Sequence, residues 1–253
     1  MRELERVPPS RLRVKPRLAV VGCGRLGAAL APALREAGFD VEGPLGRGAD
    51  PPGADAVLLC VPDAEIAAAA AVISPGPLVG HCSGAAGLEL VAPHEAFSLH
   101  PLMTVTERGA DFAGAGAAIA GSTQPALGLA ENLATALGMR PVRIADGDRA
   151  AYHAAASMAS NFLVTLEAAA EHLASAVGVD RSYLVPLVRA AVENWAAEGP
   201  ERALTGPVAR GDEATIEAQR TAIEERAPQL TALFDALVAA TRALAGAREV
   251  ERV

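Results

Sequence analysis

Residues 18–27 are Leu-Ala-Val-Val-Gly-Cys-Gly-Arg-Leu-Gly, four apolar residues followed by glycines at positions 22, 24 and 27. The apolar run predicts a strand, and the alanine-rich residues that follow predict a helix. In this setting the first glycine permits a tight turn, the second lets a phosphate approach the backbone, and the third lets helix and strand pack closely. The amides that open the helix attract anions. The stretch therefore predicts a dinucleotide-binding loop.

The alternative for this loop is a glycine-rich turn that binds nothing, but the order of strand, turn and helix argues against it. Val61 ends the third predicted strand and Pro62 follows it, where the nicotinamide half of the cofactor would pass, and Asp63 is expected to cap the next helix. The residues expected to contact the cofactor in the loop are Gly22, Cys23, Gly24, Arg25, Leu26 and Gly27.

The end of the second predicted strand distinguishes NAD from NADP, because NAD enzymes usually place a carboxylate there. Glu42 has about the expected spacing from Gly22, roughly twenty residues, but lies inside the strand. Arg47 lies at the end of the strand, where a guanidinium can pair with a 2′-phosphate. We therefore expect NADP, with NAD as the alternative and with Arg47 as a solvated loop charge in that case.

Short apolar runs alternate with helical segments from residue 17 to about residue 146. Strands are predicted near residues 18–22, 41–45, 56–61, 78–81, 96–100, 117–120 and 142–144, and helices over 25–37, 63–73 and 123–137. After residue 146 only helices are predicted, over 149–177, 180–197, 212–225 and 228–247. The fold expected is α/β, a Rossmann doubly wound and mostly parallel sheet followed by an all-helical C-terminal domain.

The change of pattern predicts three segments: a frayed or disordered tail over 1–16, a dinucleotide-binding domain over 17–147, and a helical domain over 148–253 that is expected to close over the substrate. The net charge of −8 and the lack of a basic stripe argue against a nucleic-acid partner. No apolar stretch has the length of a membrane span. The three cysteines lack metal-ligand spacing, which indicates a reducing cytoplasm and no metal.

Polar residues follow two neighbouring strands, in His81-Cys82-Ser83-Gly84 and in Ser98-Leu99-His100-Pro101. Ligands of open parallel sheets lie at the carboxyl ends of the strands, so His81, Ser83 and His100 are candidate site residues. A structural role is the alternative for each histidine. A zinc site built from His81, Cys82 and His100 lacks the usual ligand spacing, and we do not expect it.

His153, Ser157 and Asn161 are spaced four residues apart, which places them on one face of the first helix of the second domain. Small apolar neighbours favour a buried face that lines a cleft over a face in water. The loop at 204–212 carries Thr205 and Arg210, which are expected to bind an acidic substrate, whereas Asp212 is expected mainly to cap the next helix.

These motifs together resemble the bacterial Rossmann-like proteins whose C-terminal half is the domain of unknown function 2520. That family is similar to pyrroline-5-carboxylate reductases, to the coenzyme F420-dependent NADP reductases and to β-hydroxyacid dehydrogenases. The resemblance implies a homodimer through the helical domains, and it keeps F420 as an alternative hydride partner.

In the β-hydroxyacid dehydrogenases a catalytic lysine precedes an asparagine by one helical turn. Asn161 fits the asparagine, but Ser157 takes the place of the lysine, and the only lysine of the chain is Lys15. His153 is then the best candidate for general acid or base, with Ser157 and Asn161 orienting the substrate.

The function expected is hydride transfer between NADP(H) and a small oxo or imino compound that bears a carboxylate. The missing lysine leaves a non-catalytic NADP(H)-binding sensor as the alternative. Turnover distinguishes the two, because a sensor binds NADPH without oxidising it. The substrate and the direction of the reaction are left open.

Overall fold

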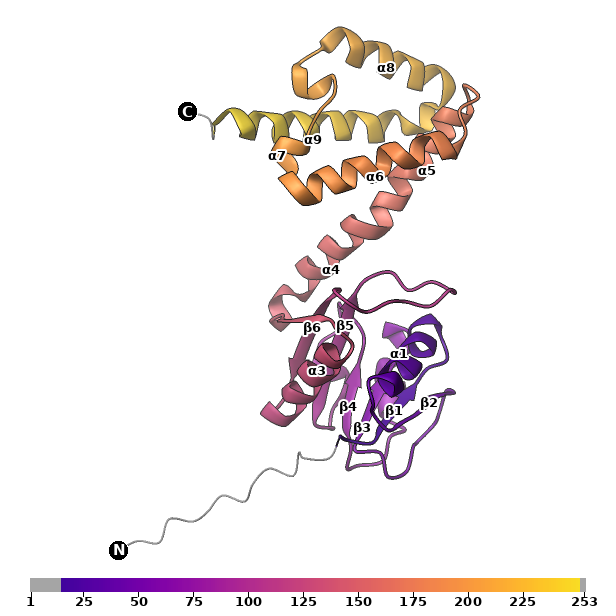
Figure 1. Cartoon of the computed structure of the whole chain (residues 1–253), viewed down its shortest axis with the longest axis vertical. Coiled ribbons are helices and arrows are strands. Elements are labelled where there is room, and N and C mark those ends of the chain that lie inside the picture. Colours follow the sequence, from indigo (N-terminus) through magenta and orange to yellow (C-terminus); the bar gives the residue numbers. More distant parts are fainter. Residues whose placement is uncertain (1–14, 251–253) are drawn as a thin grey trace, which may run out of the picture. The chain divides into compact units, whose positions relative to one another are not determined.

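The computed structural model describes residues 15–250, so most of the predicted tail over 1–16 lies outside the described residues. The chain divides into two compact units between Ser160 and Asn161. Figure 1 labels their helices and strands.

The first unit is built on a seven-stranded sheet with the order β2-β1-β3-β4-β5-β6-β7. All neighbouring strands are parallel except β5 and β6. The prediction of a mostly parallel sheet is confirmed, and each predicted strand position holds a strand. The strands are β1 (Leu18–Val21), β2 (Val41–Leu45), β3 (Ala56–Leu59), β4 (Leu78–His81), β5 (Ala96–Leu102), β6 (Gly116–Gly121) and β7 (Arg140–Arg143).

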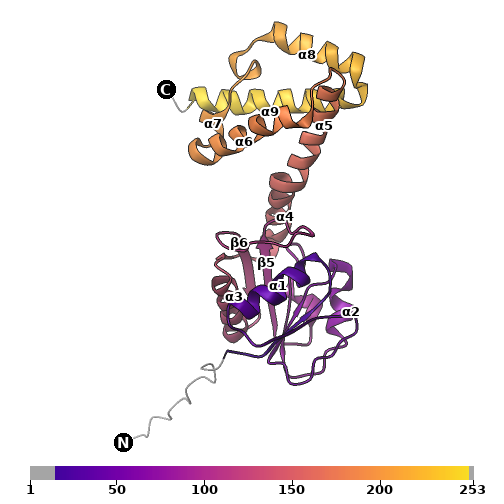
Figure 2. The same cartoon turned by 45° about the vertical axis from the view of Figure 1, so that its right-hand side comes forward.

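Helices cover both faces of this sheet (Figure 2). Helices α1 (Arg25–Glu36) and α3 (Gln124–Ala136) pack on one face, where Leu30 and Leu133 join a core that includes Phe97. Helix α2 (Ile66–Ala70) follows the 3-10 turn η1 (Asp63–Glu65) and packs on the other face, with Ile66 against Val57 and its neighbours. Burying strands on both faces explains their near-continuous apolar sequences. The sheet is therefore Rossmann-like and doubly wound.

Shorter 3-10 turns complete the first unit, η2 (Leu88–Val91) after β4 and η3 (Asp146–Asp148) after β7. Helix α4 (Arg149–Ser157) then closes it. The sequence places a boundary after residue 147, where the strand pattern ends. The compact unit extends further because α4 packs on the sheet, through Arg149 and Tyr152, as described below.

In its described residues, 161–250, the second unit contains only helices, as predicted. A π-helical turn, η4 (Met158–Phe162), leads into α5 (Leu163–Ser175). It breaks the single helix expected over 149–177. The remaining helices are α6 (Arg181–Glu198), α7 (Pro200–Ala203), η5 (Val208–Arg210), α8 (Glu213–Arg226), η6 (Pro228–Leu230) and α9 (Thr231–Val250).

Within the described part of the chain, no helix combines the length and the apolar character that a membrane span requires.

Candidate functional site

Two glycines of the loop after β1 are required by the backbone around them. Gly22 has a φ of +121°, and a Cβ there would lie 2.2 Å from the carbonyl oxygen of Cys60. A Cβ on Gly27 would lie 1.9 Å from the carbonyl oxygen of Gly22. Larger residues at either position would force the backbone apart. These contacts hold the loop tightly between β1, the end of β3 and helix α1.

The middle glycine of the loop is open instead. Gly24 is exposed and is the N-cap of α1, and no atom lies within 4 Å of the place where its Cβ would be. No side chain caps this helix, so the amides of its first turn are available to an anion. Cys23 and Arg25 are exposed beside it, while Leu26 packs against the core. This geometry fits the pyrophosphate of a dinucleotide.

The two charged residues of the second strand region differ in their surroundings. Glu42 accepts a hydrogen bond from Arg17 at 3.2 Å, near the beginning of β1. Arg47 follows the end of β2, is 83% exposed, and forms an ion pair with Glu65 of η1 at 2.8 Å. Glu42 is thus engaged at the amino ends of the strands, whereas Arg47 lies on the side of the glycine loop.

The loop after β4 is organised by His81, which is fully buried. Its Nδ1 accepts a hydrogen bond from the amide of Ser83 at 3.2 Å, so its Nε2 carries a proton and donates to the carbonyl of Gly87 at 3.1 Å. Burial lowers the pKa of His81 and keeps it neutral. Both ring nitrogens of His81 are therefore occupied by the loop itself.

Ser83 ties the same loop to the end of β3. Its hydroxyl donates to Asp63 at 2.7 Å and accepts from the amides of Ala85 and Ala86. The expectation that Asp63 caps its helix is wrong, because Asp63 is the first residue of η1 and its carboxylate binds Ser83 instead. Val61 is half-buried and Pro62 exposed just before it.

His100 meets the first turn of α4. Its Nδ1 lies 2.8 Å from the hydroxyl of Tyr152, and the two rings meet edge to face at 86°. The ring centroids of His100 and His153 are 6.3 Å apart. Burial, with a smaller contribution from His153, lowers the pKa of His100 to about 4, and burial raises the pKa of Tyr152. At neutral pH both groups are uncharged.

Arg149 anchors α4 to the sheet. Its guanidinium is nearly inaccessible, 3% exposed for the residue, and donates to the hydroxyl of Ser98 at 3.1 Å and to Asp146 at 2.8 Å. Sequence reasoning missed both Arg149 and Tyr152. Tyr152 directly precedes the predicted site residue His153, and this position could have indicated a role in the site. Nothing in the sequence indicates that Arg149 is buried.

The helix face predicted to carry His153, Ser157 and Asn161 is a regular α-helix only in part. His153 is exposed and Ser157 half-buried, both on α4. Asn161 lies in the π-helical turn, where the spacing of a regular α-helix does not hold. Such turns occur often at functional sites.

The predicted substrate-binding loop lies in the second unit. Thr205 and Arg210 are exposed, and no ion pair involves Arg210 in the described part of the chain. Asp212 caps α8 as expected, since its carboxylate accepts from the amide of Thr215 at 3.1 Å.

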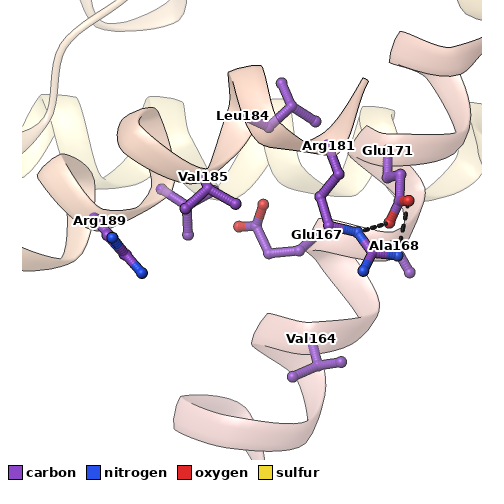
Figure 3. Close-up of a pocket in the computed structure, with 9 residues that line it drawn as sticks. Val164, Glu167, Ala168, Glu171, Arg181, Leu184, Val185 and Arg189 are labelled. Carbon is purple, nitrogen blue, oxygen red and sulfur yellow. Dashed lines mark hydrogen bonds and ion pairs between the residues drawn. The ribbon is translucent and has the colours of Figure 1, made fainter. Parts of the chain in front are cut away.

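A separate open pocket of about 460 Å³ lies between α5 and α6 of the second unit (Figure 3). Its apolar lining is Val164, Ala168, Leu184, Val185 and Val188. Charged side chains surround this lining, and Arg181 pairs with Glu171 at 2.8 Å. None of the predicted site residues lines this pocket.

Among residues 15–250 no three His, Cys, Asp or Glu side chains are arranged to hold a metal ion. Cys82, weighed as a zinc ligand, instead has its sulfur 3.8 Å from that of Cys60.

Comparison with known proteins confirms the resemblance of the sequence. Residues 116–241 match the model of the domain of unknown function DUF2520. A comparison with curated proteins finds no matching sequence. The match spans β6, α3, β7 and most of the helical unit.

Three solved structures share the fold. A Bacteroides fragilis protein with the provisional name NADP oxidoreductase is 20% identical, with a TM-score of 0.78 over 90% of this chain and 98% of its own. A Thermotoga maritima protein is 24% identical, with a TM-score of 0.75 over 93% and 100%. A reductive aminase from Aspergillus terreus is 16% identical, with a TM-score of 0.62 over 90% and 96%. Pyrroline-5-carboxylate reductases are also among the structural neighbours.

Proposed function

We propose that this chain, which carries DUF2520 over residues 116–241 and a Rossmann-type sheet, is an NADP-dependent oxidoreductase. It transfers a hydride to or from a small oxo or imino compound that bears a carboxylate. The observation that carries the proposal is the uncapped start of α1 beside the open Gly24. The reductive aminase neighbour, which holds NADPH and ethyl-5-oxohexanoate, supports the same class of chemistry.

The preference for NADP rests on Arg47. Its guanidinium follows β2 and is largely exposed, so it can turn toward a 2′-phosphate. Glu42, the competing candidate for a ribose-binding carboxylate, is engaged by Arg17. NAD would gain no contact from Arg47.

The bound cofactor supplies the hydride, and the protein orients the substrate and handles the proton. In our proposal His153 is the general acid or base, Ser157 and Asn161 orient the substrate, and His100 completes the pocket. Thr205 and Arg210 bind the carboxylate. His81 and Ser83 support the loop after β4, because their polar atoms are already bound within it.

Calorimetric titration with NADPH and NADH tests the cofactor assignment. We expect NADPH to bind more tightly than NADH, and Arg47→Ala to remove the difference. Arg143→Ala is the matched control. Arg143 is also exposed and also pairs with a glutamate, Glu131 of α3, but it lies on β7, at the opposite edge of the sheet from β2. If neither nucleotide bound, the oxidoreductase proposal would be abandoned, and F420 would be titrated next.

A non-catalytic NADP(H) sensor is the second candidate, and one observation favours it. Lys15, the only lysine of the chain, donates to the carbonyl of Ala37 at 2.7 Å at the far end of α1. No lysine is therefore available for catalysis. A sensor would bind NADPH but oxidise none of it with any oxo acid or imine offered, as followed by NADPH absorbance.

We also propose a homodimer formed through the helical unit. Large apolar side chains are exposed on α5 and α6, among them Val164, Tyr183, Leu187 and Trp195. Several large apolar side chains exposed on two neighbouring helices are typical of an interface. Light scattering after gel filtration tests it. Leu187→Glu should give a monomer, whereas Val72→Glu, at an exposed apolar position of the first unit, should leave the dimer intact. A monomeric wild-type protein would refute the proposal.

We propose the cytoplasm as the location. The sulfurs of Cys60 and Cys82 are 3.8 Å apart, and no disulfide joins them. The hydrogen bond with Cys60, together with burial, raises the pKa of Cys82. Because oxidising compartments favour disulfides between neighbouring cysteines, a reducing compartment suits this pair.

A further inference from the structure

His100, a predicted site residue, pairs with Tyr152, which the sequence did not predict. The hydroxyl of Tyr152 is 2.8 Å from Nδ1 of His100, and the ring centroids are 5.6 Å apart. The pair joins β5 to α4 across 52 residues of sequence. The hydroxyl therefore contacts Nδ1 of the imidazole and not Nε2.

The direction of this hydrogen bond follows from the chemistry of the two groups. A phenol is a good donor and a weak acceptor, whereas the unprotonated nitrogen of a neutral imidazole is a strong acceptor. Burial raises the pKa of Tyr152 and so keeps its proton on the oxygen, while His100 is neutral at pH 7. Tyr152 thus donates to Nδ1, which leaves the single proton of His100 on Nε2.

The other nitrogen of His100 is free for a ligand. Among the described residues no hydrogen bond is made by Nε2 of His100. The edge of the ring lies against Gly84, where an added Cβ would be 3.0 Å from Nε2 and 2.8 Å from Cε1. Gly84 thus provides the space that the imidazole occupies.

We propose that Tyr152 is a positioning residue that fixes His100 as the Nε2–H tautomer, and that this N–H donates a hydrogen bond to the carbonyl oxygen of the substrate. The inference rests on the proposed function. Negative charge develops on that oxygen as hydride adds to the carbon, and an oriented neutral donor stabilises it. The nitrogen of an iminium ion has no lone pair to accept such a bond, so this donor favours oxo compounds over iminium ions.

Charged and titratable groups of α4, β4 and η1 surround His100. His153 and Arg149 of α4 and His81 of β4 disfavour a positive charge on His100, and Asp63 of η1 favours it. Burial is the largest of these effects, and it lowers the pKa of His100. The neutral form is therefore the one that meets a substrate near pH 7.

The test is nitrogen NMR of the full chain labelled in its five histidines, with the His100 signals assigned from His100→Gln. We expect a protonated Nε2 and an unprotonated Nδ1 in the wild type. Tyr152→Phe should give a mixture of tautomers, and Tyr183→Phe, which removes the only other tyrosine hydroxyl, should change nothing. A protonated Nδ1 in the wild type, or an unchanged tautomer in Tyr152→Phe, would overturn the proposal.

This experiment needs neither cofactor nor turnover, so its failure is separate from that of the proposed function. Absence of NADPH binding would refute the function while the tautomer is still measured. With NADPH and an oxo substrate, Tyr152→Phe should lower kcat by about tenfold or more and leave the Kd of NADPH unchanged. An unchanged kcat would also overturn the proposal.

Discussion

The guanidinium of Arg149 donates a hydrogen bond to the hydroxyl of Ser98 at 3.1 Å, inside the first unit. This contact joins the first turn of α4 to β5, two residues before His100. It therefore fixes the helix that carries Tyr152 and His153 relative to the strand that carries His100.

Replacement of Arg149 tests this anchor. Arg149→Ala removes the packing and the hydrogen bonds of a buried side chain, and should lower the free energy of unfolding by about 2 to 3 kcal/mol. Its ion-pair partner Asp146 is 68% exposed. Water can therefore solvate the carboxylate that the substitution leaves unpaired, which limits the loss of stability. Urea unfolding gives the value. The exposed Arg143→Ala should cost less than about 0.5 kcal/mol, and equal losses for the two variants would contradict the anchor.

The glycine loop makes opposite predictions for two alanine substitutions. Gly24→Ala meets no protein atom, so the protein should fold normally, but the methyl group should weaken NADPH binding by about tenfold, or 1.4 kcal/mol. Gly27→Ala forces the backbone apart and should cost about 3 kcal/mol of stability. Calorimetry and thermal unfolding separate the two effects. Gly128→Ala, in open space on α3, controls for the methyl group and should not weaken binding.

Glu65 should oppose recognition of a 2′-phosphate, because it pairs with Arg47 and would repel the phosphate. Glu65→Gln should tighten NADPH binding by about two- to fivefold and leave NADH binding unchanged. Titrations at low salt measure both constants. Equal gains for NADPH and NADH would mean that Arg47 does not read the 2′-phosphate.

Acid should destabilise the fold through His100. Its pKa is about 4 in the folded protein, below the ordinary histidine value of 6.5, because burial disfavours the charge. The unfolded chain therefore binds more protons between these values, so stability is complete above pH 6.5 and falls as pH drops toward 4. We expect a loss of about 2 kcal/mol from pH 7.5 to pH 5.

Unfolding in urea at the two pH values measures this loss. His100→Gln should reduce the pH dependence by that amount and leave the contribution of His81, whose pKa burial also lowers. If His100→Gln left the pH dependence intact, His100 would not be the group that titrates.

Local sequence patterns were sufficient for the elements of the fold. Every predicted strand position holds a strand. Strands such as β1 and β3 are recognisable because burial on both faces makes them short apolar runs. The loop from Gly22 to Gly27 was also predictable from local sequence. Gly22 and Gly27 lie where nearby backbone leaves no room for a side chain, and Gly24 leaves the start of α1 open. The cap of α8 by Asp212 depends only on the next turn of helix. The π-helical turn at Met158–Phe162 has no comparable pattern, and the sequence missed it.

The sequence by itself determined a Rossmann-type sheet, its glycine loop and the helical second half, because these depend on residues close together along the chain. Only the tertiary structure decided which polar groups meet: Tyr152 with His100 across 52 residues, and Ser98 with Arg149 across 51. It also decided that both nitrogens of His81 are bound within its own loop. Hydrogen bonds between distant segments depend on how the helices pack on the sheet, and burial sets the charge of each group only after that packing is complete.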